Sequence, residues 1–275
     1  MLERIAKENC QLIDYIGSPS LRGIVTGLNE AFIIDADARN QLILAAPTLT
    51  EILRPVCVGS EIRRYGVEWA GHYLIYTYHG IDLSNYSLIE EFLENYRDQL
   101  ENRAIRQEWY ELQQPQKAYE DKLISPKIVM PDMAESGRFQ LDENGMFLTN
   151  TAYFLPTDDK YLLALLNSKL LTFCLANTSS TFGGGYLRLF GQYVERLPIR
   201  VVTPQMSERK RKELIQNIVG LLEQKKNTSL KERILQLLLP IEEYADVIHD
   251  LLALLADQMI ILFEERVLLV ERFFY

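Results

Sequence analysis

Residues 139–150 read FQLDENGMFLTN, two runs in which apolar and polar residues alternate around the pair Asn144-Gly145. Such alternation is typical of a strand with one buried face. An Asn-Gly pair between two such runs is the strongest short-range signal for a tight turn joining antiparallel strands. We therefore predict a β-hairpin at these residues, and a fold that contains a β-sheet.

Shorter segments on both sides have the composition of strands or the spacing of helices. The runs AFIID (31–35), HYLIYTY (72–78) and PKIVMP (126–131) are dense in β-branched and aromatic residues, which favour strands. Apolar residues recur at helical spacing over 86–103 and 161–174, which predicts two amphipathic helices. Together they indicate an α+β fold, a mixed β-sheet with flanking helices.

The composition changes after Pro204, where glycine and strand-forming residues nearly disappear and Leu, Ile, Glu and Lys dominate. We therefore predict an α+β domain over residues 1–204 and a helical C-terminal region over residues 205–275. The helical region is expected to act as a support or spacer. Its apolar stripe is wide enough to require a partner, either another helix of this chain or another polypeptide.

Capping signals give the expected helix boundaries in the C-terminal region. Ser207 can cap a first helix, which the pair Asn227-Thr228 should end. Ser229 and Glu232 have the spacing of a capping box that opens a second, longer helix. Pro240 should kink or interrupt this second helix before it continues towards Phe263.

The chain of 275 residues is 48% hydrophobic, enough for a substantial core, and its formal net charge is −9. A protein that binds nucleic acid unaided usually carries a basic excess that releases counterions from the phosphates. Two alternatives follow from the acidic charge. Either the partner is not nucleic acid, or this chain supplies sequence specificity while another component supplies the electrostatic attraction.

Neither a membrane segment nor a metal site is expected. The N-terminal residues lack the apolar run of a signal peptide, and the most apolar tract, 251–262, is interrupted by Asp257 and Gln258. We expect a soluble, cytoplasmic protein. The cysteine and histidine residues lie too far apart to suggest a disulfide framework or a zinc site; they are Cys10, Cys57, Cys174, His72, His79 and His249.

No catalytic constellation is found in the sequence. The motifs of a Walker loop, a dinucleotide site and a serine-hydrolase elbow do not occur. Asp132 and Glu135 have the spacing of acidic residues in metal-dependent nucleases, but Gly137 stands where such a cluster requires a lysine. We therefore predict no catalytic residue in this chain.

Several stretches, taken in order, resemble a single family. They are GIVTGLNEAFIID (23–35), LRPVCVGSEIRRY (53–65), EWYELQQP (108–115), SPKIVMPDM (125–133), NTAYFLP (150–156), KYLLALLNSKLLTF (160–173) and GGGYLRLFGQYVERLPI (183–199). This set resembles the TaqI-like C-terminal specificity domain. That domain is the target recognition domain of adenine-N6 DNA methyltransferases, including fused type IIG restriction-modification enzymes.

The resemblance implies a non-catalytic module that recognises a sequence in double-stranded DNA. The methyltransferase tetrapeptide N-P-P-[YFW] and a glycine-rich loop for S-adenosylmethionine do not occur in this sequence. The resemblance therefore implies that the methyltransferase catalytic domain is fused upstream or separate, and that S-adenosylmethionine belongs to that domain. No cofactor is expected in this chain, which is similar to the C-terminal portion of a longer enzyme.

The stretch TSSTFGGGYLRLFGQ (178–192) could cradle a phosphate, read a base or turn the chain. The missing Walker motif disfavours a phosphate cradle. We expect a structural turn followed by a strand in which Tyr186, Arg188 and Phe190 share one face. Arg188 could then offer a bidentate contact to guanine, and Gln192 could pair with adenine. Tyr186 is a further candidate for DNA contact on this strand.

Other side chains are candidates for DNA contact. Arg63, Arg64 and Tyr65 form a compact basic and aromatic cluster suited to phosphate, although exposed arginines at a strand start are common. Thr26 and Asn29 could present a hydroxyl and an amide, or Asn29 could simply form a turn. Further candidates for phosphate contact are Lys127, Arg138 and the basic run 209–212, the last of which is also typical of a solvated helix face.

A second class of function remains open. The C-terminal helices could form a partner interface in a protein-interaction module for which DNA is irrelevant. If the chain instead recognises DNA, its acidic charge predicts weak binding of random duplex by the chain alone.

Overall fold

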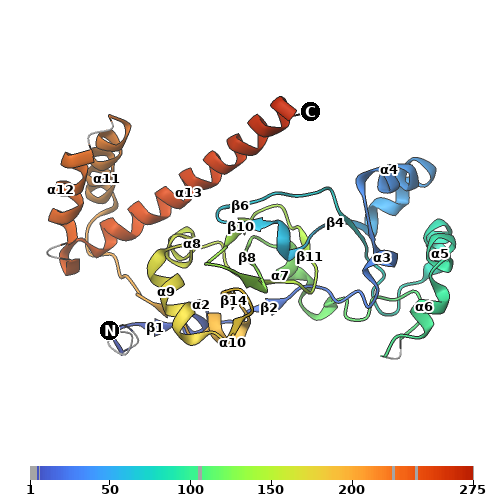
Figure 1. Ribbon diagram of the computed structural model, residues 1–275. Helices are drawn as coiled ribbons and strands as arrows, with labels where there is room; N and C mark the ends of the chain where they lie inside the picture. Colours follow the sequence, from blue (N-terminus) through green and yellow to red (C-terminus); the bar gives the residue numbers. More distant parts are fainter. Residues whose placement is uncertain (1–4, 6, 105–106, 225–226, 239–240, 275) are drawn as a thin grey trace.

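The computed structural model describes residues 5, 7–104, 107–224, 227–238 and 241–274. Figure 1 shows an elongated molecule with its strands at the centre and groups of helices at both ends. The α+β class predicted from the sequence is confirmed, with mixed sheets, flanking helices and a helical C-terminal region.

The central sheet is built on strand β8 (Lys127–Pro131), which is buried along its whole length. Strand β10 (Gln140–Asp142) and strand β12 (Ala152–Leu155) pair with its two edges, and β2 (Leu21–Arg22) pairs with β12, all antiparallel. Val129 belongs to one hydrophobic core and Ile128 to another, on opposite faces of the strand. Burial on both faces explains why this strand reads as a continuous apolar run.

A second sheet has the strand order β11 (Phe147–Leu148), β4 (Leu53–Cys57), β7 (Tyr73–Ile75), β3 (Ile33–Ile34). Its β11–β4 pair is parallel, and its other pairs are antiparallel. The strands predicted at 72–78 and 31–35 are therefore present but shorter. Ala31 and Phe32 instead end the short helix α3 (Asn29–Phe32), where both side chains are buried.

The hairpin predicted at residues 139–150 is wrong, because β10 and β11 lie in different sheets. The turn itself is present: Gly145 has φ +69°, and the Asp142 carboxylate accepts the N–H groups of Asn144 and Met146 at 3.0 and 2.9 Å. A carboxylate that binds the following backbone amides closes such a turn locally. The chain then leaves one sheet and enters the other.

Short ribbons complete the strand structure. Strand β14 (Tyr186–Arg188) pairs with β13 (Thr181–Phe182) and β9 (Met133–Ala134), and β5 (Ile62–Arg63) pairs with β6 (Gly66–Val67). A further pair joins β1 (Cys10–Gln11) to β15 (Pro198–Ile199), so an N-terminal segment lies beside the end of the α+β region.

Each helix predicted in the α+β region is divided in two. The first becomes α5 (Ser87–Glu94) and α6 (Arg97–Glu101), and the second becomes α8 (Lys160–Leu166) and α9 (Lys169–Thr178). Ser168 causes the second break, since its Oγ accepts the N–H of Leu171 at 3.2 Å and caps α9. The remaining short helices are α2 (Leu12–Ile16), α4 (Ala36–Ala45), α7 (Glu120–Ile124) and α10 (Gly191–Val194).

The C-terminal region contains α11 (Glu208–Glu223), α12 (Asn227–Leu238) and α13 (Ile241–Phe274), which share a small core around Ile218 and Val247. Two expected boundaries are wrong. Helix α11 ends before the pair Asn227-Thr228, and Ser229 lies inside α12 rather than capping it. Ser207 precedes α11, but its side chain forms no capping hydrogen bond. Pro240, the predicted interruption, lies outside the described residues.

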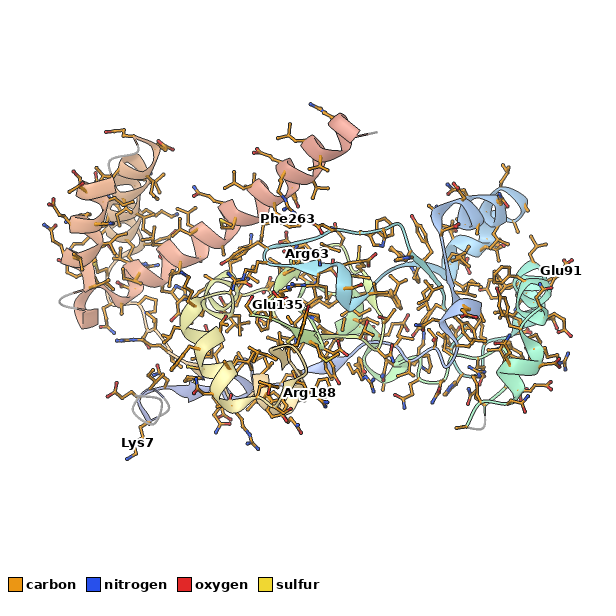
Figure 2. All side chains as sticks on the ribbon, in the orientation of Figure 1. Lys7, Arg63, Glu91, Glu135, Arg188 and Phe263 are labelled. Atoms are coloured by element: carbon orange, nitrogen blue, oxygen red, sulfur yellow. The ribbon has the colours of Figure 1, made fainter. Side chains whose placement is uncertain are left out.

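Helix α13 runs from this C-terminal bundle across α8 to β6 (Figure 1). The ring of Phe263 packs directly on Gly66, where an added Cβ would lie 1.9 Å from Cδ1 of the ring. Figure 2 shows Phe263 next to the β5–β6 ribbon that carries Arg63. The Glu68 carboxylate forms ion pairs with Arg266 of α13 at 2.6 Å and with Arg63 at 2.8 Å. The last helix is therefore attached to the ribbon that holds a predicted DNA contact.

Candidate nucleic-acid interface

A broad hollow with a volume of about 860 Å³ opens on the surface where several distant segments meet. We call it the Asp132 hollow. Its walls come from the turn after β4, the segment between β8 and β10, the β11–β12 connection and the β13–β14 loop. It is lined by Asn29, Val58, Gly59, Ser60, Arg63, Asp132, Met133, Arg138, Thr149, Thr151, Gly183 and Tyr186.

The Asp132 hollow brings together four residues that the sequence predicts as DNA contacts. They are Asn29, Arg63, Arg138 and Tyr186, which lie in different segments of the chain. Only tertiary structure places them on one surface. Their contact with DNA stays a prediction.

The two arginines of the hollow differ in their electrostatic environment. Arg63 pairs with Glu68 at 2.8 Å and donates to the carbonyl oxygen of Ser60 at 2.5 Å, so its position is fixed by the protein. Arg138 is half-buried and forms no ion pair with any residue in the described ranges. Its guanidinium can therefore bind an incoming anion without first breaking a salt bridge.

The neighbouring residues Arg64 and Tyr65 form the turn of the β5–β6 ribbon. Arg64 is exposed, and its Nε donates to the carbonyl oxygen of Gly137 at 2.9 Å. Tyr65 has φ +62°, and its backbone N–H donates to the carbonyl oxygen of Phe139 at 3.0 Å. Its ring packs against the core below the turn, and this burial raises the pKa of the Tyr65 hydroxyl. The cluster predicted from the sequence thus presents two arginines, while its tyrosine anchors the turn.

The glycine run forms the tip of the β13–β14 hairpin. Gly184 and Gly185 both have φ +87°, and no neighbouring group lies within 4 Å of a Cβ added at Gly183 or Gly185. Gly184 and Gly185 are therefore required by backbone conformation and not by crowding within the protein. The expected alternation is confirmed, because Leu187 and Leu189 are buried while Tyr186 is exposed.

Arg188 and Gln192 lie outside the lining of the hollow. Arg188 is half-buried, with its guanidinium 5.4 Å from the ring centroid of Phe190, and its strand pairs with Met133 at the edge of the hollow. Gln192 is exposed on α10. Base contacts by these two residues stay predictions.

Two candidate contacts are corrected by burial. Lys127 is fully buried and forms an ion pair with Asp142, so its ammonium is not available to a phosphate. Thr26 is 3% exposed and donates its hydroxyl to the side chain of Asn29 at 2.6 Å. In the basic run 209–212, Arg211 pairs with Asp250 of α13, which gives it a role in holding the helices together.

The sequence interpretation did not assign four polar residues of the hollow to DNA contact. Ser60, Asp132, Thr149 and Thr151 line it together. The hydroxyls of Thr149 and Thr151 lie 2.8 Å apart, and Thr151 Oγ1 accepts the N–H of Gly59 at 2.9 Å. A Cβ at Gly59 would lie 2.2 Å from the Thr151 carbonyl oxygen, so the close approach depends on glycine. The available signal was the position of Asp132 directly after a buried strand.

Neither a metal-binding group nor a membrane-spanning helix is found among the described residues. No group of three or more His, Cys, Asp or Glu side chains could hold a metal ion in the ranges that the structure describes. Among the same residues, no helix has the length and apolar character needed to cross a membrane.

Comparisons with known proteins show what the chain is similar to. It is 21% identical over 225 residues to Type II methyltransferase M.BstVI of Geobacillus stearothermophilus, covering 78% of this chain and 38% of that protein. It is 23% identical over 188 residues to Type II methyltransferase M.PaeR7I of Pseudomonas aeruginosa, covering 64% of this chain and 31% of that protein. The chain thus spans less than two fifths of the length of these relatives.

A solved structure shares the fold. The Type IIL restriction-modification enzyme MmeI, in complex with DNA, matches with a TM-score of 0.51 at 14% identity, over 88% of this chain and 32% of that chain. The family model of the TaqI-like C-terminal specificity domain matches residues 54–199, which include most of the lining of the Asp132 hollow. Because the match covers more than half of its residues, the chain belongs to the family of TaqI-like C-terminal specificity domains.

Proposed function

We propose that this chain is the DNA target-recognition module of a type II, IIG-like restriction-modification enzyme or of an adenine-specific DNA methyltransferase. The observation that carries the proposal is the Asp132 hollow, where basic, aromatic and amide side chains from separate segments share one surface. Such a surface combines groups that bind phosphate with groups that can bind base edges. The relatives and the DNA-bound structure support this assignment through their names and the shared fold.

Catalysis belongs to a methyltransferase domain, fused upstream or separate, in this proposal. S-adenosylmethionine is assigned to that domain as well. The longest glycine run of this chain is the exposed tip of the β13–β14 hairpin, with no helix directly after it, so it does not have the form of a nucleotide-binding loop. This chain positions the DNA, and the catalytic domain acts on the target adenine.

Affinity selection from a randomised duplex pool tests the proposal. The selection is done at low salt, because a net charge of −9 weakens binding through the phosphates. The enriched duplex is then titrated against a scrambled duplex, and we expect a preference of at least about tenfold. No enrichment, with or without a methyltransferase domain from a relative, would contradict sequence recognition by this chain.

A matched pair of variants locates the contact surface. Arg138→Ala removes a cation of the Asp132 hollow that has no ion-pair partner in the described part of the chain, whereas Arg209→Ala removes an exposed cation of α11. We expect only Arg138→Ala to weaken binding, by about tenfold or more, because a charge-assisted hydrogen bond is lost. Equal effects of the two variants would contradict the assignment of the DNA-binding surface.

One observation favours a second function, a protein-interaction module. Helix α13 exposes apolar side chains along its C-terminal half, at Met259, Ile261, Leu262, Leu268, Leu269 and Val270. Exposed apolar stripes of this kind mark contact surfaces. If no duplex is enriched, and Leu262→Lys with Leu269→Lys abolishes association with a methyltransferase domain, this second function replaces the first.

A further inference from the structure

Asp132 is the one acidic side chain that lines the Asp132 hollow in the described part of the molecule. Its backbone is held from two sides: its N–H donates to the Thr151 carbonyl oxygen at 2.8 Å, and its carbonyl oxygen accepts the N–H of Leu189 at 2.8 Å. The residue therefore lies between the β11–β12 connection and the segment directly after β14. A group fixed in this way loses little entropy when it contacts a ligand.

The carboxylate of Asp132 has no ion-pair partner within the described ranges. Burial raises its pKa, although nearby backbone amides and the charges of Arg22 and Arg188 act in the opposite direction. The cations of the hollow, Arg63 and Arg138, do not form a salt bridge with it. The protein thus keeps a half-buried carboxylate without a salt bridge on a surface that we assign to DNA.

An acidic group on such a surface is unfavourable beside phosphates, so a compensating interaction is required. An ionised carboxylate only accepts hydrogen bonds. In the major groove, cytosine presents an N4 amino donor, whereas guanine presents acceptors, thymine an acceptor and a methyl group, and adenine an amino group beside the N7 acceptor. Cytosine is therefore the base whose edge offers a donor without a neighbouring acceptor.

We propose that Asp132 is a specificity-determining residue that accepts a hydrogen bond from the N4 amino group of a cytosine in the target site. This inference rests on the proposed function, since it requires that the Asp132 hollow faces the major groove. It assigns to Asp132 a contact with one base and leaves the other positions of the site to other residues.

Duplex selection with three proteins tests the inference: the unaltered chain, Asp132→Ala and the control Glu135→Gln. Glu135 is an exposed acid close in sequence that does not line the hollow. We expect the unaltered chain and Glu135→Gln to select a cytosine at one position. Asp132→Ala should show no base preference there, because its side chain has no hydrogen-bond acceptor, and should keep the other positions.

A second measurement replaces the amino group instead of the protein side chain. In the selected duplex, the cytosine is exchanged for 2-pyrimidinone, which lacks the N4 amino group. Binding by the unaltered chain should fall by about tenfold or more, and binding by Asp132→Ala should fall by much less. Urea unfolding of each variant checks that the proteins are folded to the same extent.

The outcomes separate the two proposals. If the unaltered chain selects a motif and Asp132→Ala selects the same motif with the same preferences, the role of Asp132 is overturned and DNA recognition stands. An equal loss of binding to the 2-pyrimidinone duplex by both proteins would also overturn that role. If none of the three proteins selects a motif, DNA recognition by this chain fails, and the role of Asp132 fails with it.

Discussion

The substitution Asp142→Asn should destabilise the protein because it leaves a buried cation without its partner. Lys127 is 0% exposed, and Asp142 lies directly opposite it in the β8–β10 register. Burial lowers the pKa of Lys127, and the attraction of Asp142 opposes this shift. Removing one partner of a buried ion pair costs about 3–5 kcal/mol, and we expect Asp142→Asn to fall in this range.

The two partners should not be equivalent. Asp142 also accepts two backbone N–H groups, from Asn144 and Met146, so it stays partly satisfied when Lys127 is replaced. Lys127→Met should therefore cost about 1–3 kcal/mol. The double variant Lys127→Met with Asp142→Asn removes both charges, and we expect it to be more stable than Asp142→Asn alone.

Urea unfolding monitored by circular dichroism measures these free energies. A pH series adds a second test. In Asp142→Asn the pKa of the buried Lys127 lies further below its unfolded value, so between the two values the unfolded state binds more protons. The stability of the variant should consequently rise as pH increases towards about 10, the pKa of an unfolded lysine. A cost below about 1 kcal/mol for Asp142→Asn, or a double variant whose cost equals the sum of the single costs, would refute the reasoning.

Three further predictions concern other parts of the molecule. Gly66→Ala should displace the Phe263 ring and destabilise the protein by about 1–3 kcal/mol, with faster proteolysis of α13. Adding Phe263→Ala to Gly66→Ala should not increase the loss of stability. Burial alone would raise the pKa of Asp246, but the N–H groups of Met206 and Gln205 hold this pKa below its usual value. The contribution of Asp246 to stability should therefore be present above about pH 4 and lost in acid. In thermal unfolding, Asp246→Asn should flatten this acid dependence. The chain alone should bind random duplex with a Kd weaker than about 10 μM at physiological salt, and micromolar or tighter binding by filter retention would contradict the division of roles with a catalytic domain.

The segment 139–150 shows why local sequence predicted a turn but not its partners. Asn144 and Gly145 sit in a turn because their conformational preferences depend only on neighbouring residues. The pairing of β10 depends on β8 instead, where the register sets Asp142 against Lys127. A buried ammonium requires a carboxylate, and this requirement outweighs the short hairpin.

The same distinction applies to the candidate site. Composition and spacing identified Arg63, Arg138 and Tyr186 as candidates, and the structure places them on one hollow. The prediction that Lys127 contacts phosphate is wrong, because the burial of a lysine cannot be derived from the residues next to it in the sequence. The sequence suggests only the role of a nuclease acid for Asp132, because the arginines and threonines of the hollow come from other segments of the chain.

By itself, the sequence determined the α+β class, the strand at β8, the helical C-terminal region and the family resemblance, because periodicity, composition and ordered motifs are properties of the chain alone. Tertiary structure decided which strands pair, which charges are buried and which polar groups meet in the Asp132 hollow. These outcomes depend on the free energy of contacts between residues far apart in the chain. Such contacts produce no pattern among neighbouring residues of the sequence.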